Sequence, residues 1–135
     1  MKTPEEIVKI MLEHDAFSKW LAISLKKISL GSCILSTIIT PEMLNGFNIA
    51  HGGISYSIAD SALAFASNSY GQKCVSIETS ISHTRPTKIG DQLTASASEL
   101  HRGKKIGIYE VIVTNQENKT IALFKGTVHI SEKIW

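Results

Sequence analysis

A single change of periodicity, midway along the chain, constrains the fold more than any other feature of the sequence. In "ISYSIADSALAFASNSYG", residues 54–71, apolar side chains recur at helical spacing, as at Ile54, Ile58 and Ala62. Alanine and serine fill most other positions, so the predicted helix can be packed closely on several sides, as a central helix is. Beyond this segment the apolar pattern has the period of strands, and no second long helix follows.

The strands are expected in two groups. Residues 23–40 are rich in β-branched side chains around a Gly-Ser pair, which predicts a hairpin. Four later segments have strand periodicity and are separated by short turns, namely residues 73–84, 92–101, 105–115 and 120–130. In the first of them the alternation puts one set of side chains on one side: Val75, Ile77, Thr79 and Ile81. Because sequential strands joined by short turns usually pair, these four are predicted to form an antiparallel meander.

The order of the elements predicts one α+β domain over residues 1–135. A short helix opens it, with Thr3 and Glu6 at the spacing of a capping box and Pro4 in the first turn. Residues 41–53 are expected to form a loop because of their Pro, Asn and Gly content. One long helix cannot cover both faces of such a sheet. We therefore expect a curled antiparallel sheet wrapped around one long central helix, with an edge or outer face that favours an oligomer.

Composition argues against several classes of function. The 14 basic and 12 acidic residues give a net charge of +2, and no basic run is interleaved with aromatic residues, so no nucleic-acid partner is expected. No apolar stretch is long enough to span a membrane, and the N-terminal segment carries acids where a signal peptide would be apolar, so we expect a cytoplasmic protein without a membrane partner. Cys33 and Cys74 form no CxxC pair and the histidines lack ligand spacing, so neither a disulfide nor a metal site is expected.

Glycine and aspartate are both unfavourable in a helix, and here they mark a candidate site. The glycines stand in His51-Gly52-Gly53 at the start of the long helix, and the aspartate is Asp60 within it. Asp60 is either a structural carboxylate satisfied by a hydroxyl such as that of Ser57, or a base or nucleophile in a partly dry cleft. The glycines either permit a tight turn or let a substrate oxygen approach the free N–H groups of the helix end. The second arrangement is what an oxyanion hole for acyl transfer requires.

The spacing of these two features predicts a dimer. Gly52 and Asp60 are eight positions apart, so their Cα atoms are separated by ~12 Å along one helix, and the free N–H groups point away from Asp60. One substrate carbonyl therefore cannot meet both groups of the same chain. A twofold dimer with two such helices facing each other antiparallel would bring each glycine pair to the partner's Asp60. This arrangement predicts an obligate dimer with two equivalent sites.

Three other polar residues are candidates for the same site, each with an ordinary alternative. Asn45 can orient a water or polarise the carbonyl, or it can form an Asn-Gly turn. His51 can hold a substrate oxygen or cap the helix. Ser76 lies on the strand after the helix and can tether the water that Asp60 activates, or it can be an ordinary strand serine.

Basic residues in two interstrand turns form a second candidate group. They are either solvated turn charges or a phosphate clamp for a nucleotide-bearing carrier. The turn "HRGKK" supplies most of them, and the full set is Lys88, Arg102, Gly103, Lys104 and Lys105.

With these motifs, the chain resembles the hotdog-fold acyl-CoA thioesterases, and among them the phenylacetic-acid-degradation (PaaI-like) group. The matching stretches are "MLNG…HGG…S.AD.A.A.A.NSYG" from Met43 to Gly71, "RP…GD.L.A.A" from Arg85 to Ala97, and "GK..G.YE..V.NQ..KT.ALF.G" from Gly103 to Gly126, followed by His129. They cover nearly all of the chain after its N-terminal segment. Many close relatives have a histidine after "LNG", where this chain has Phe47.

The resemblance implies a role for each candidate residue. Asp60 would attack the thioester or activate the hydrolytic water, and Gly52 of the facing subunit would donate its N–H to the thioester oxygen. Asn45 and His51 would line the site, and Ser76 falls where some relatives carry a water-positioning hydroxyl. The "HRGKK" turn and Lys88 fall where relatives hold the CoA portion of the substrate. The implied enzyme is a homodimer, commonly paired into a tetramer, that hydrolyses acyl-CoA, with phenylacetyl and hydroxyphenylacetyl groups the leading acyl class. It is expected to need no metal or redox cofactor, because CoA arrives as part of the substrate.

Two alternatives accompany this expectation. A hotdog enoyl-CoA hydratase or dehydratase also uses an acid and a histidine, but the chain lacks the proline-rich "GHFP"-like loop of such enzymes. A non-catalytic acyl-CoA-binding protein usually carries an additional DNA-binding module, and we expect the segment before the first strand to be too short to hold one.

Overall fold

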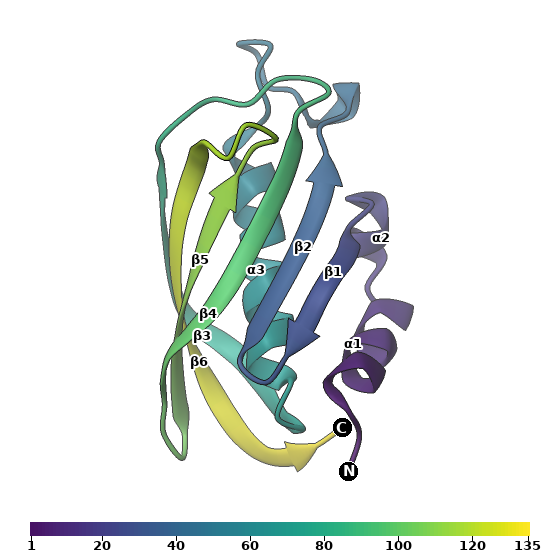
Figure 1. Ribbon diagram of the computed structural model, residues 1–135, viewed down its shortest axis with the longest axis vertical. Coiled ribbons are helices and arrows are strands. Elements are labelled where there is room, and N and C mark those ends of the chain that lie inside the picture. Colours follow the sequence, from purple (N-terminus) through teal and green to yellow (C-terminus); the bar gives the residue numbers. More distant parts are fainter.

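The computed structural model describes residues 1–135, and its central element is a 17-residue helix, α3 (Gly52–Asn68), held in the hollow of a six-stranded antiparallel sheet (Figure 1). The strands are β1 (Ser24–Ser29), β2 (Ser32–Ile38), β3 (Gln72–His83), β4 (Gln92–Arg102), β5 (Ile106–Thr114) and β6 (Thr120–Ile134). The remaining elements are α1 (Pro4–Glu13), α2 (Ala16–Trp20) and the 3-10 turn η1 (Pro41–Met43). The predicted α+β architecture, with a curled sheet around one long helix, is confirmed. None of the helices has the length and apolar character needed to cross a membrane.

The strand order is β1-β2-β4-β5-β6-β3, which confirms part of the predicted meander and corrects the rest. β4, β5 and β6 pair in sequence order, and the first hairpin joins β1 to β2 as expected. β3 does not pair with β4, however, but with β6, so residues 84–91 are a crossover and not a hairpin turn. The reason is that β2 occupies the other edge of β4, where Cys33 lies opposite Ala97. The free edge of β6 is the position that remains for β3.

The predicted alternation along β3 fails at one residue. The register shifts between Ser76 and Glu78, so Ile77 has no partner on β6, as in a β-bulge. Val75 and Ile77 are 64% and 58% exposed. Thr79, beyond the bulge, reaches the helix instead, and its Oγ1 lies 2.6 Å from the hydroxyl of Tyr56 on α3.

The N-terminal helices pack near α3. Thr3 and Glu6 form the predicted capping box at the start of α1. The helix α2 was not predicted, because five residues are too few to show a period. Asp15 caps it by accepting from the backbone N–H and the hydroxyl of Ser18, at 2.9 and 2.6 Å. The Ser18 hydroxyl lies 3.3 Å from that of Ser61, which links α2 to α3.

Small residues let α3 approach the sheet closely, as the sequence indicated. Ala59, Ala62 and Ala66 are fully buried. Gly126 on β6 faces the helix so closely that a Cβ there would lie 2.5 Å from Cδ2 of Leu63. The helix is therefore held in one position relative to the sheet, because close-packed interiors leave little freedom to shift.

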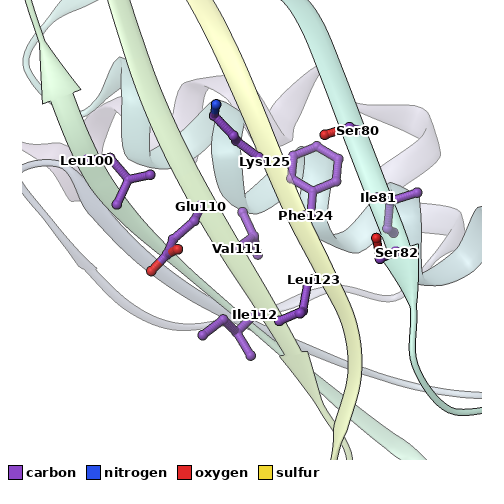
Figure 2. Close-up of a pocket in the computed structure, with 10 residues that line it drawn as sticks. All are labelled: Ser80, Ile81, Ser82, Leu100, Glu110, Val111, Ile112, Leu123, Phe124 and Lys125. Atoms are coloured by element: carbon purple, nitrogen blue, oxygen red, sulfur yellow. The ribbon is translucent and has the colours of Figure 1, made fainter.

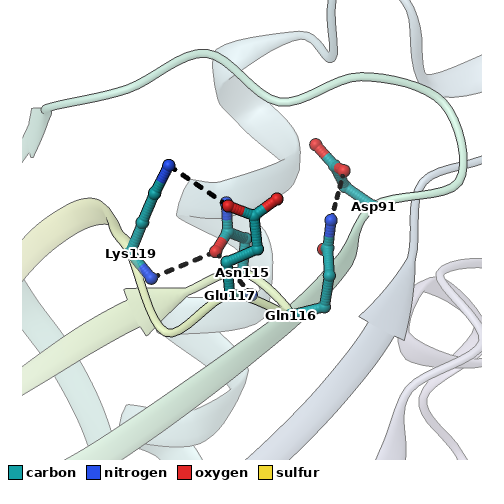
Figure 3. Close-up of polar contacts among 5 residues, drawn as sticks. All are labelled: Asp91, Asn115, Gln116, Glu117 and Lys119. Carbon is teal, nitrogen blue, oxygen red and sulfur yellow. Dashed lines mark hydrogen bonds and ion pairs between the residues drawn. The ribbon is translucent and has the colours of Figure 1, made fainter.

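The crossover between β3 and β4 is tied to the turn between β5 and β6 (Figure 3). Asn115 Oδ1 accepts from the backbone N–H groups of Glu117 and Lys119, at 3.0 and 3.1 Å, which closes that turn. Gln116 then donates through Nε2 to Asp91 at 2.8 Å, at the end of the crossover. A separate hydrogen bond, from the backbone N–H of Ala50 to the Thr87 carbonyl, holds the crossover near the start of α3.

Candidate active site

The first turn of α3 presents one free backbone donor. His51 is the N-cap, and its Nδ1 accepts from the Gly53 N–H at 2.8 Å. Gly52 is the first residue of the helix, so its own N–H has no partner within α3, and it makes no backbone hydrogen bond outside the helix. The helix dipole places partial positive charge at this point. The capping interpretation of His51 thus matches the structure, and the Gly52 N–H remains available to an incoming oxygen.

A cavity of about 320 Å³ opens beside this donor and includes Asn45, Gly52 and His83 in its lining. Asn45 also closes its own loop, since its Oδ1 accepts from the Phe47 N–H at 2.9 Å and from the Ile49 N–H at 3.4 Å. The turn-forming interpretation of Asn45 is therefore correct, and the residue still lines the cavity at the helix start. The Phe47 side chain is 86% exposed and is not part of that lining.

Asp60 lies two turns further along α3 and faces two other cavities. One, of about 390 Å³, lies against the N-terminal helices and is partly lined by Met11, Phe17 and Phe65. The other, of about 270 Å³, lies between α3 and β3 and includes Ser76. The structure therefore brings Ser76 and Asp60 to one cavity.

The carboxylate of Asp60 has no hydrogen bond or ion pair within the chain. Ser57, the hydroxyl expected to satisfy it, donates to the Gly53 carbonyl at 2.6 Å instead. Burial of the carboxylate raises the pKa of Asp60 above its ordinary value. A half-buried carboxylate without a partner is what a general base or nucleophile needs, whereas a structural carboxylate needs donors.

Asp60 and Gly52 do not meet within one protomer. Gly52 lines the cavity at the helix start, and Asp60 lines the two cavities further along α3. This separation agrees with the argument from their spacing, in which one chain cannot supply both groups to one carbonyl.

The basic candidates also fall into two places. Lys88 belongs to the crossover that leads into β4, and Lys104 and Lys105 belong to the turn that follows β4. These two connections lie at opposite ends of β4 (Figure 1). An 11-residue strand spans about 35 Å, so one protomer does not bring Lys88 together with the two turn lysines. The side chains of Lys104 and Lys105 are exposed.

Arg102 points into the protein, unlike those lysines. Its guanidinium lies 4.1 Å from the centre of the Tyr70 ring and donates to the Ser67 carbonyl and the Gln72 side chain, both at 3.2 Å. These contacts join the end of β4 to the end of α3. Gly103 closes the turn through its N–H, which donates to the Ile106 carbonyl at 2.8 Å.

Sequence reasoning missed His83, which lies at the end of β3 against the first turn of α3. Its Nε2 is 3.0 Å from the Ser55 hydroxyl and 3.2 Å from the Gly52 carbonyl oxygen. The signal was present, because the alternation that turns Thr79 and Ile81 toward the helix reaches His83 two residues later.

A further cavity lies on the opposite side of the sheet from α3 (Figure 2). Exposed apolar side chains of Leu100, Ile112 and Leu123 line its floor, beside the charged side chains of Glu110 and Lys125. It contains neither Asp60 nor Gly52, so it is separate from the candidate site. Nowhere do three or more His, Cys, Asp or Glu side chains gather in a way that could hold a metal ion.

Comparison with known proteins identifies the family. The Thioesterase superfamily model matches residues 47–122, which include Gly52, Asp60 and Ser76. The chain is 41% identical over 119 residues to the acyl-coenzyme A thioesterase PaaI of Escherichia coli, covering 88% of this chain and 85% of that protein. The solved structure of the E. coli PaaI protein from the phenylacetic acid degradation operon superimposes with a TM-score of 0.95 at 37% identity, over 97% of this chain and 95% of that one.

A second solved structure, a Streptococcus mutans protein bound to acetyl CoA, matches with a TM-score of 0.81 at 26% identity, over 84% of this chain and 91% of that one. These likenesses confirm the predicted hotdog architecture and the predicted class of reaction, which is thioester hydrolysis. The chain belongs to the thioesterase superfamily and is a hotdog-fold hydrolase that acts on thioester bonds.

Proposed function

We propose that this protein hydrolyses arylacetyl-CoA thioesters in the seam between two subunits, with Asp60 of one subunit and the Gly52 N–H of the other acting on the same carbonyl. The observation that carries the proposal is the carboxylate of Asp60, which is half-buried, has no partner in its own chain and opens into cavities. The likeness to an E. coli acyl-coenzyme A thioesterase supports CoA as the carrier.

The free edge of the sheet at β3 supports the proposed dimer. β3 is an edge strand of 12 residues that has exposed Val75 and Ile77 and an unpaired outer row of backbone groups. Such an edge readily pairs with another strand. Antiparallel pairing of β3 with its own copy continues the sheet and sets two α3 helices antiparallel, so that Gly52 of each subunit faces Asp60 of the other.

A second association is supported by the outer face of the sheet. The exposed patch of Leu100, Ile112 and Leu123 lies on the side of the sheet away from α3 (Figure 2). Contiguous apolar surface of this kind favours protein contacts. We therefore expect two dimers to pair through it as a tetramer.

In the reaction, the thioester oxygen accepts a hydrogen bond from the Gly52 N–H, and negative charge develops there as the carbonyl carbon is attacked. The attacking group is a water that gives its proton to Asp60, or the Asp60 carboxylate itself, which forms an anhydride that water then opens. In both routes the C–S bond breaks and CoA leaves as the thiolate. The raised pKa of Asp60 makes its carboxylate a better base. The Ser76 hydroxyl lines the same cavity as Asp60, which supports a role in holding the water.

The two ends of the substrate have different surroundings. The cavity that includes Met11, Phe17 and Phe65 offers an apolar wall beside Asp60 for an aryl group. An antiparallel dimer sets Lys88 of one subunit at the same end as Lys104 and Lys105 of the other, although these lysines lie far apart within one chain. Together they would contact the phosphates of CoA.

The test is a hydrolysis panel of phenylacetyl-CoA, hydroxyphenylacetyl-CoA and short- and long-chain acyl-CoA esters, with Asp60→Asn as the variant. We expect arylacetyl esters to be hydrolysed best and the variant to be slower by ~10²–10⁴-fold. Glu117→Gln, which changes an exposed carboxylate of the β5–β6 turn, is the control and should keep native activity.

Three results would contradict the proposal. Equal hydrolysis by the Asp60→Asn variant would remove the carboxylate from the mechanism. Hydration of crotonyl-CoA without hydrolysis of any thioester would indicate the hydratase alternative, and tight CoA binding without turnover would indicate a binding protein.

A further inference from the structure

His83 touches the one backbone segment on which the proposed oxyanion donor depends. Its Nε2 lies 3.2 Å from the Gly52 carbonyl oxygen and 3.0 Å from the Ser55 hydroxyl, and that hydroxyl donates to the same carbonyl at 3.2 Å. Three groups from β3 and α3 therefore meet at the first turn of the helix.

Gly52 and the His83 ring lie unusually close to each other. A Cβ on Gly52 would lie 3.1 Å from Cε1 and 3.3 Å from Nε2 of His83. Most side-chain contacts are longer than this, so a residue larger than glycine would have to displace the ring. The position of the imidazole and that of the Gly52 backbone thus depend on each other.

The geometry points to His83 as the positioning residue of the oxyanion donor. In this inference, which rests on the proposed function, the imidazole is the Nε2–H tautomer and donates to the Gly52 carbonyl. That hydrogen bond fixes the peptide plane between Gly52 and Gly53. Through the backbone torsions of Gly52, this plane in turn restrains the direction in which the Gly52 N–H enters the cavity. His83 exchanges no proton with the substrate.

Loss of the His83 hydrogen bond should slow the chemical step rather than weaken substrate binding. Charge on the substrate oxygen is greatest in the transition state, so a misdirected N–H lowers kcat more than it raises KM. A histidine that merely touched bound substrate would change KM instead, and one that only stabilised the fold would change neither at a temperature well below unfolding.

The test compares His83→Ala and His83→Gln with His129→Ala, an exposed histidine of β6 outside the candidate cavities. Loss of one hydrogen bond should lower kcat of His83→Ala by roughly 3- to 10-fold, with little change in KM. His83→Gln should recover most of this loss, because a glutamine amide N–H can reach the place of Nε2–H. The His129→Ala variant should match the native protein.

A structural readout keeps the inference testable whatever the activity. In ¹H–¹⁵N spectra the Gly52 and Gly53 amide signals should move in His83→Ala and stay near their native positions in His83→Gln. If native protein hydrolyses no thioester, the proposed function fails while these shifts still decide the hydrogen bond. Unmoved signals in His83→Ala, a native kcat in that variant, or a glutamine variant as slow as the alanine variant would each overturn the inference.

Discussion

Replacing Gly52 by proline removes the proposed oxyanion donor and leaves the helix in place. Gly52 is the first residue of α3, a position where proline is favoured and where its missing N–H takes no bond from the helix. His51 before it has φ −57° and ψ 137°, an extended backbone that a following proline tolerates. The added Cβ would lie 3.1 Å from His83 Cε1, so Gly52→Ala, which has the same Cβ and keeps the N–H, is the matched control.

The difference in kcat between Gly52→Pro and Gly52→Ala measures the contribution of the Gly52 N–H alone. Removal of one oxyanion-hole donor is worth about 2.7–4 kcal/mol, so kcat of Gly52→Pro should be ~10²–10³-fold below that of Gly52→Ala. The assay is release of the CoA thiol, followed with a chromogenic disulfide, and thermal unfolding shows whether α3 is intact. Equal kcat values in two folded variants would refute the role of the Gly52 N–H.

Three other predictions concern charge. Burial raises the pKa of Asp60 above its ordinary 3.8, so ionisation opposes folding at neutral pH; Asp60→Asn should raise Tm at pH 7, and the gain should vanish as the pH falls toward 3.8. Burial alone would raise the pKa of Asp91, but hydrogen bonds from the Lys88 backbone and Gln116 lower it overall. Asp91→Ala should therefore cost about 1–3 kcal/mol in urea unfolding at pH 7, and less as the pH falls below 3.8. Replacing Lys104 and Lys105 by alanine should raise KM for acyl-CoA but leave KM for a thioester lacking the nucleotide unchanged, and equal increases would contradict a phosphate contact.

Local features of the fold were predictable from the sequence because they depend on neighbouring residues. The capping box at Thr3, the apolar stripe of α3 and the short turns between β4, β5 and β6 all follow from nearby side chains. The partner of β3 was not predictable in the same way. It depends on which sheet edges remain free after β2 has paired with β4, and the residues of β3 carry no information about that pairing.

The candidate site also has residues that were predictable from the sequence and contacts that were not. His51, Gly52 and Asp60 stand out in sequence because glycine and aspartate are unfavourable in a helix unless something requires them. The inward turn of Arg102 and the contact of His83 with Gly52 come from residues distant in sequence, and only the assembled fold brings them together. A bulge at Ile77 also moved the β3 side chains from their predicted faces, because one extra residue reverses a period of two.

Mixing two inactive variants tests most directly whether each site is shared between subunits. Asp60→Asn chains keep Gly52, and Gly52→Pro chains keep Asp60, so a hybrid dimer has one site with both native groups and one with neither. After the two variants are unfolded and refolded together, activity should return to about a quarter of the native level, since half of the dimers are hybrids with one intact site of two. Activity no higher than the average of the two variants, in samples that contain hybrid dimers, would show that each chain works alone.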